Sequence, residues 1–119
     1  MVTKRVLAAA LFFCFALLAP RVALAHAVLV SSTPAANAEV HGPSLAIELR
    51  FNSRVDGERS RLFLVMPGGQ SQALPVEKQS TATTLGAHIM LKPGSYRIRW
   101  QALSTDGHIT RGEIPFTVR

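Results

Sequence analysis

The chain has 119 residues, 48% of them hydrophobic, and a formal net charge of +6. This length allows one small domain and excludes two. The basic residues after position 25 are spread along the chain rather than run together, and Tyr96 and Trp100 alternate with polar residues in one segment, as core aromatics of a strand do. We therefore expect no nucleic-acid binding.

Residues 1–25 have the pattern of a cleaved secretory signal peptide. Two basic residues at 4–5 precede an apolar run at 6–18, and the small-x-small pattern at 23–25 is one that signal peptidase accepts. The run of about 13 residues is too short for an ordinary membrane span, so we expect a mature form that is not embedded in a membrane. The single cysteine, Cys14, lies inside the run, which leaves the mature domain without a disulfide.

Cleavage after Ala25 gives a mature domain at residues 26–119 that begins with His26. Loss of three basic residues lowers the count of Lys and Arg from 13 to 10 against 7 acidic residues, so the mature net charge is about +3. Because Ala25-His26-Ala27 is also small-x-small, cleavage after Ala27 is a competing possibility. We favour Ala25, since the later site would extend the cleavage region into a strand that begins at Val28.

The mature domain has an all-β pattern of short strands separated by turns. Apolar and polar residues alternate clearly at 44–51 and 95–103. Further strands are predicted at 61–66, 72–76, 81–85, 87–91 and 112–119. About seven short strands without a helical period favour an antiparallel β-sandwich.

A polar loop between the last two strands contains Asp106 and His108. These residues are two apart, so an extended backbone points them to the same side, and Gly107 lets it bend. A terminal His26 would add an amine and an imidazole that can chelate one ion. Three nitrogens and one carboxylate oxygen suit Cu(II) in a tetragonal site, whereas zinc would need a tetrahedral arrangement of the same donors.

The two ends of the mature chain resemble the CopC family of periplasmic copper-binding proteins. The similarity is carried by His26 with residues 29–35, by the alternating strand at 45–53, and by the closing segment at 100–118. The resemblance implies a seven-stranded, immunoglobulin-like Greek-key β-sandwich that binds one Cu(II) per mature chain. It also implies that the ligands are the amine and ring of His26, with Asp106 and His108.

The function implied by the resemblance is copper storage, buffering or delivery in copper homeostasis and resistance, without catalysis. An inner-membrane transporter of the CopD type is the implied recipient, and we expect a periplasmic monomer. One alternative is a terminal-histidine copper monooxygenase, but Asp106 would fill a position that oxygen needs, and about 94 residues leave little room for a substrate surface. The other alternative is a metal-free β-sandwich interaction module.

The remaining histidines and methionines have simpler interpretations. His41 precedes a turn and is expected at the surface, while His88 is expected as a half-buried strand residue. Met66 and Met90 are expected to fill the core. Because they form no Met-x-x-Met cluster, the chain lacks the methionine-rich Cu(I) loop of some CopC proteins, and we expect a protein that binds Cu(II) only.

Overall fold

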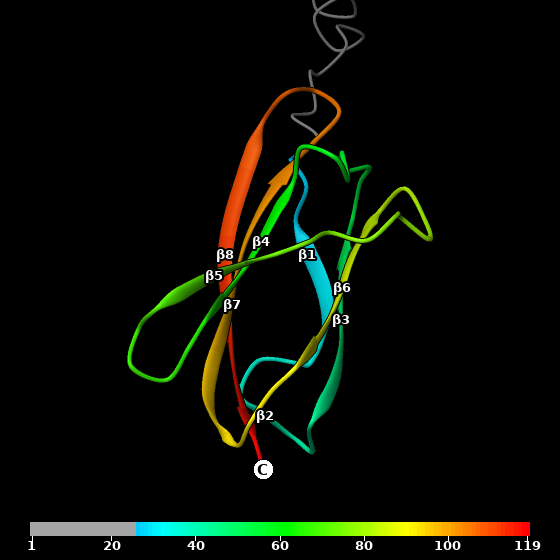
Figure 1. The fold of residues 1–119 in the computed structure, drawn as a ribbon. Coiled ribbons are helices and arrows are strands. Elements are labelled where there is room, and N and C mark those ends of the chain that lie inside the picture. Colours follow the sequence, from blue (N-terminus) through cyan, green and yellow to red (C-terminus); the bar gives the residue numbers. More distant parts are fainter. Residues whose placement is uncertain (1–25) are drawn as a thin grey trace, which may run out of the picture.

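Residues 26–119 of the computed structural model are described, and they form two β-sheets packed face to face (Figure 1). The eight strands are β1 (Leu29–Thr33), β2 (Ala38–Val40), β3 (Ser44–Phe51), β4 (Arg61–Val65), β5 (Ser71–Leu74), β6 (Thr84–Met90), β7 (Gly94–Leu103) and β8 (Ile109–Val118). No helix in this part of the chain is long and apolar enough to cross a membrane. The signal peptide predicted at residues 1–25 lies outside the described residues.

One sheet has the order β1-β3-β6 and the other β2-β8-β7-β4-β5. The chain changes sheet five times, at the connections β1–β2, β2–β3, β3–β4, β5–β6 and β6–β7, and it forms an immunoglobulin-like Greek-key sandwich. The predicted all-β sandwich is therefore confirmed. The sequence did not predict the short strand β2, which pairs in parallel with the end of β8. A segment of three residues is too short to show an alternating pattern.

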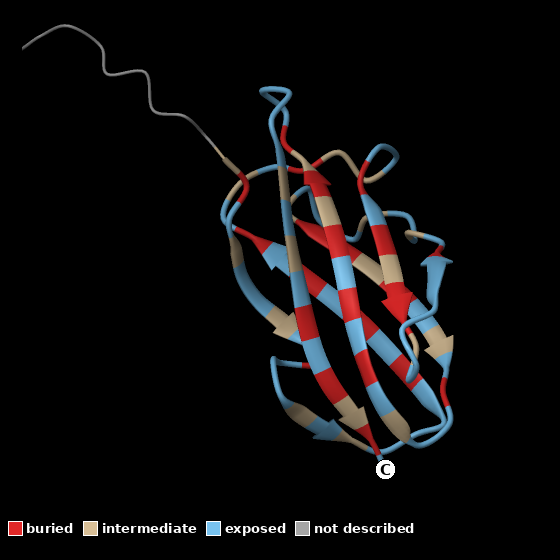
Figure 2. Cartoon of the chain, turned by 90° about the vertical axis from the view of Figure 1, so that its left-hand side faces the viewer, coloured by how far each residue is buried: buried red, intermediate tan, exposed pale blue. Residues whose placement is uncertain are grey.

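The core lies between the sheets and is filled by the alternating residues of the long strands, as Figure 2 shows by its stripes of buried and exposed positions. In β3 the inward residues are Leu45, Ile47, Leu49 and Phe51, and in β7 they include Tyr96, Ile98 and Trp100, all of them buried as predicted. Trp100 lies opposite Gly112 of β8, where a Cβ atom would come within 2.5 Å of the indole ring. This glycine therefore makes room for the core tryptophan.

Three expectations from the sequence were wrong in detail. The separate strands predicted at 81–85 and 87–91 are one strand, β6, because Thr84 to Met90 pair without interruption with β3. The last strand begins at Ile109 rather than at Gly112, so the loop before it is shorter than predicted. Met66 packs against the core as expected, but Met90 is 70% exposed at the end of β6.

Candidate metal centre

The start of the described chain lies against the β7–β8 loop at one end of the sandwich (Figure 1). The imidazole rings of His26 and His108 are in edge-to-face contact, with centroids 4.7 Å apart and an interplanar angle of 78°. Two residues separated by more than 80 positions in the sequence are thereby brought together. This contact places His26 against the Asp-x-His loop.

The two residues after His26 are fixed to the sandwich by hydrogen bonds. Ala27 is 1% exposed, and its carbonyl oxygen accepts a 2.8 Å hydrogen bond from the Thr110 hydroxyl on β8. The Val28 amide donates to the Asn52 side chain at 2.8 Å, and the Asn52 amide donates back to the Val28 carbonyl at 3.0 Å. Because the backbone is held directly after it, His26 is confined to the neighbourhood of the loop.

The loop itself is a tight turn organised by the buried Ser104. The Ser104 amide donates to the His108 carbonyl at 2.9 Å, and the Gly107 amide donates to the Ser104 carbonyl at 3.0 Å. Gly107 has φ = 89°, in the left-handed region that favours glycine. The His108 amide donates to Asp106 Oδ1 at 3.2 Å, and the Ser104 hydroxyl donates to the same oxygen.

These hydrogen bonds hold the Asp106 carboxyl group in its ionised form. The Ser104 hydroxyl is the main cause, followed by the His108 amide, and together they lower the pKa of Asp106 to about 2. Asp106 Oδ2 lies 3.1 Å from His108 Nδ1, which also favours the charged carboxylate. A negative charge is thus maintained beside the His108 imidazole at all ordinary pH values, which favours a cation.

The structure brings His26, Asp106 and His108 together without forming a finished coordination sphere. Among residues 26–119, no group of three or more histidine, cysteine or acidic side chains is already arranged to hold a metal ion. The Nδ1 atom of His108 is instead engaged with Asp106. The side chains of Asp106 and His108 are 31% and 49% exposed. Both side chains therefore have room to rotate toward an ion. Imidazole nitrogens and a carboxylate oxygen are donors that suit Cu(II), although their geometry here is not preformed.

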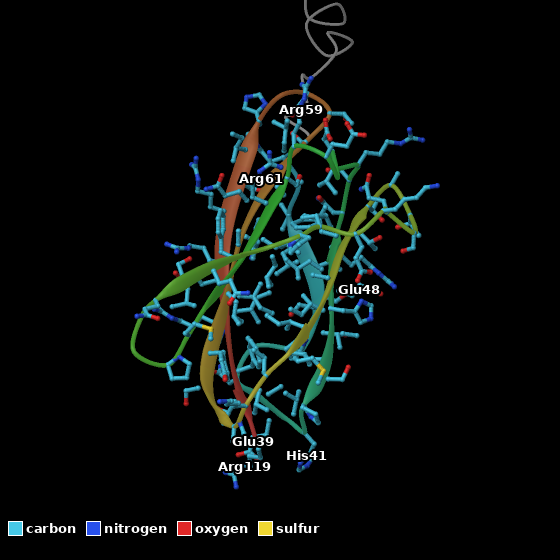
Figure 3. All side chains as sticks on the ribbon, in the orientation of Figure 1. Glu39, His41, Glu48, Arg59, Arg61 and Arg119 are labelled. Atoms are coloured by element: carbon cyan, nitrogen blue, oxygen red, sulfur yellow. The ribbon has the colours of Figure 1, made fainter. Side chains whose placement is uncertain are left out.

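The other two histidines lie away from this end. His41 is exposed in the turn between β2 and β3, at the opposite end of the sandwich, where Figure 3 labels it. His88 was expected to be half-buried but is exposed on β6, where its Nδ1 contacts the Glu77 carboxylate. Sequence reasoning missed Glu77, because it lies in an irregular segment eleven residues before His88 and has no pattern of its own.

Residues 29–119 match the family model of the CopC domain. The chain belongs to the CopC family. As the resemblance predicted, this is a family of copper-binding proteins and not of enzymes.

Relatives include Protein YobA of Escherichia coli, 34% identical over 99 residues that cover 80% of each chain. Copper resistance protein C of Xanthomonas campestris pv. juglandis is 32% identical over 111 residues, or 86% of this chain and 87% of the relative. Copper transport protein CutJ of Bacillus subtilis is 29% identical over 87% of this chain, but only 20% of CutJ is covered.

Two solved structures are similar in fold and sequence. CopC from Methylosinus trichosporium OB3b has a TM-score of 0.71 and 29% identity, over 78% of this chain and 93% of that one. PcoC from Escherichia coli, described as a methionine-rich copper resistance protein, has a TM-score of 0.68 and 27% identity, over 80% and 100%. The present chain has three methionines including Met1, so it lacks the composition for which PcoC is named.

Proposed function

We propose that the mature protein begins at His26 and holds one Cu(II) ion in the periplasm for storage, buffering or delivery. The amine and ring of His26, the carboxylate of Asp106 and the ring of His108 are the proposed ligands. The observation that carries the proposal is the contact between the His26 and His108 rings beside an ionised Asp106. Three of the four donors are nitrogens, a set that Cu(II) prefers.

The anchoring of Ala27 supports cleavage after Ala25. Cleavage after Ala27 would remove a residue that is 1% exposed, together with the carbonyl that accepts the Thr110 hydrogen bond. The Thr110 hydroxyl, half-buried, would then lose its partner at a cost of about 1 kcal/mol or more. Cleavage after Ala25 keeps these contacts and leaves a single residue, His26, with freedom to turn its amine and ring onto one ion.

Delivery to a membrane copper transporter of the CopD type is part of the proposal. It is supported by the similarity to one fifth of CutJ, a copper transport protein much longer than this chain. A CopC-like segment thus exists within a larger transport protein, as expected if CopC-like domains act next to a transporter. We expect the separate protein to be a monomer that passes copper on by ligand exchange.

Intact mass of the secreted protein, with and without added Cu(II), tests the proposal directly. We expect a mass that begins at His26 and an increase equal to one copper ion. Electron paramagnetic resonance should show a tetragonal spectrum with nitrogen hyperfine structure. A mature chain that begins at Val28, or a sulfur-rich spectrum, would disprove the ligand set.

A further inference from the structure

The outward face of the five-stranded sheet carries a concentration of arginines. Register pairs place Arg61 of β4, Gln101 of β7 and Arg111 of β8 in one row, and Phe63, Arg99 and Glu113 in the next. Arg97 lies one step further along β7, and residues paired in register share a face of the sheet. We call the four exposed residues Arg61, Arg97, Arg99 and Arg111 the arginine face.

This face holds the whole net charge of the mature domain. The four arginines and Glu113 give it a net charge of about +3, equal to the net charge of residues 26–119. At the β2 edge of the same sheet, Arg119 and Glu39 form an ion pair at 2.8 Å, which adds no net charge. Figure 3 labels this pair at the end of the sandwich opposite Arg61. The other surfaces are therefore neutral in sum, and the domain is strongly polarised toward one sheet.

Three of the arginines make contacts at the sheet surface, where all four remain exposed. The Arg61 guanidinium donates to the Glu58 and Ser60 carbonyls, at 2.7 Å and 2.9 Å. The Arg99 guanidinium lies 5.7 Å from the centre of the Phe63 ring and donates to the Ser71 hydroxyl at 2.9 Å. Arg97 donates to Glu113 at 3.0 Å in an exposed ion pair, which contributes little energy and so leaves the arginine able to exchange its partner. Neighbouring strands are about 4.8 Å apart, and residues two apart on one strand about 6.7 Å, so the four arginines form a closely spaced array on one face of the sheet.

From this array we propose that the arginine face binds the anionic surface of a phospholipid membrane. A cationic face spread over three neighbouring strands matches an extended surface of phosphates better than it matches a single strand of nucleic acid. All four cations are arginines, whose planar fork pairs with phosphate oxygens in bidentate geometry, whereas the two mature lysines, Lys78 and Lys92, lie elsewhere. Association with the sheet face against the lipid would be electrostatic and reversible.

This proposal deepens the proposed function, because of where the candidate metal centre lies. Arg111 lies near the start of β8, three residues after His108 of the preceding loop, so the arginine face extends to the end that carries the candidate metal centre. A domain lying on this face would keep its copper at the membrane surface, within reach of a transporter embedded there. Membrane binding itself needs no copper, so it can fail or succeed independently of the metal ligands.

Cosedimentation of the copper-free mature protein with vesicles tests the inference. At low ionic strength we expect binding to mixed phosphatidylglycerol and phosphatidylcholine vesicles on the order of 100-fold tighter than to pure phosphatidylcholine, from about three net charges. At roughly 1 M salt, where the screening length is about 3 Å, binding should disappear. Equal binding to both vesicles, or no binding to either, would overturn the proposal.

Matched charge variants locate the surface. The triple variant R97Q/R99Q/R111Q should lose the preference for anionic vesicles, while R50Q/K78Q/K92Q, with the same overall charge, should keep it. Glu113→Gln should tighten binding by about 5-fold, because it removes the one carboxylate of the face. Equal losses in the two triple variants would show that net charge alone is responsible and overturn the assignment to this face. Tight binding to a DNA duplex without vesicle binding would overturn it as well.

Copper titration of the same variants separates this inference from the proposed function. Both triple variants should bind Cu(II) as the parent protein does, because none of the substituted residues is a proposed ligand. A parent protein that binds anionic vesicles but not copper would contradict the copper proposal and leave the arginine face supported. A parent protein that binds copper but no vesicles would support the copper proposal and contradict membrane binding by the arginine face.

Discussion

Two exposed histidines of this protein each contact a carboxylate through Nδ1, yet only one of the pairs is a candidate metal centre. His108 lies 3.1 Å from Asp106 in the β7–β8 loop, and His88 contacts Glu77 on the outer surface of the three-stranded sheet. Their side chains are 49% and 63% exposed, so solvent access does not distinguish them. The difference lies in what else each pair can recruit.

His108 has a second imidazole against it, whereas the residue opposite His88 on the neighbouring strand β3 is Ala46. Asp106 is also held by Ser104 and by the backbone of its own turn, at a separation of two residues. Glu77 reaches His88 from an irregular segment. A histidine–carboxylate pair alone therefore does not identify a metal site. The His108–Asp106 pair is the candidate because His26, from a distant part of the chain, can add further nitrogen donors.

A change in pH should affect Cu(II) affinity more than any single substitution does. In model compounds a terminal amine ionises near pH 8 and an imidazole near 6.5, and each must lose its proton to bind copper. Because the pKa of Asp106 is about 2, its carboxylate stays ionised throughout this range, and the nitrogen ligands alone determine how Cu(II) affinity depends on pH. Cu(II) affinity should fall by at least ~1,000-fold from pH 8 to pH 5. A competition titration at each pH measures this, and a flat profile would contradict the nitrogen donors.

Alanine substitution of the two histidines should separate the pairs directly. His108→Ala removes a ligand, and Cu(II) affinity should fall by at least ~100-fold, or about 2.7 kcal/mol. His88→Ala serves as the matched control, since it removes an imidazole of similar exposure and should leave copper affinity unchanged. Isothermal titration of both variants against the parent protein is the measurement. If the two variants lose affinity alike, the distinction between the pairs is wrong.

The third donor can be weakened without changing any side chain. Acetylation of the His26 amine, or one extra residue before it, leaves the ring in place but breaks the chelate. We expect a loss in Cu(II) affinity of at least ~10-fold, or about 1.4 kcal/mol. Acetylation of lysine side chains alone, with the terminus left free, is the control. A blocked protein that binds as tightly as the native one would show that His26 acts as an ordinary internal histidine or does not bind.

The sequence predicted the sandwich because its long strands carry a pattern with period two. The alternation at 44–51 and 95–103 identified the core residues of β3 and β7 correctly. The candidate ligands were also predictable, since Asp106 and His108 are neighbours and His26 follows a cleavage pattern. The bond from Thr110 to Ala27 was not predictable, because it joins residues 83 apart and depends on how the sheets close. No local sequence pattern predicts such a contact.

That contact gives the next prediction, on how His26 is positioned. Thr110→Val keeps the size of the side chain but removes the donor to the Ala27 carbonyl. Loss of one hydrogen bond of about 1 kcal/mol in holding the terminus should lower Cu(II) affinity by about 5-fold. Thr117→Val, at the far end of the same strand, is the control and should have no effect on copper. An unchanged affinity in Thr110→Val would mean that the terminus is positioned by Asn52 alone.

The smallest effect is expected from Ser104, which acts through Asp106. Ser104→Ala removes the hydroxyl that contributes most to the lowered pKa of Asp106, so that pKa should rise toward the ordinary value near 3.9. Because a carboxyl group with either pKa is ionised at pH 7, copper affinity there should fall only about 3-fold, through poorer orientation. Nuclear magnetic resonance titration of the Asp106 carboxyl carbon reports the pKa directly.

The same variant has a defined effect on the pH dependence of folding. A carboxyl group whose pKa is lower in the folded than in the unfolded chain stabilises the fold above about pH 4, and that contribution disappears as pH falls toward 2. Ser104→Ala should reduce the part of the stability that is lost in this window, while His88→Ala should not. If the Asp106 pKa stays near 2 in Ser104→Ala, the backbone amide of His108 holds the carboxylate by itself, and the buried serine serves only to close the turn.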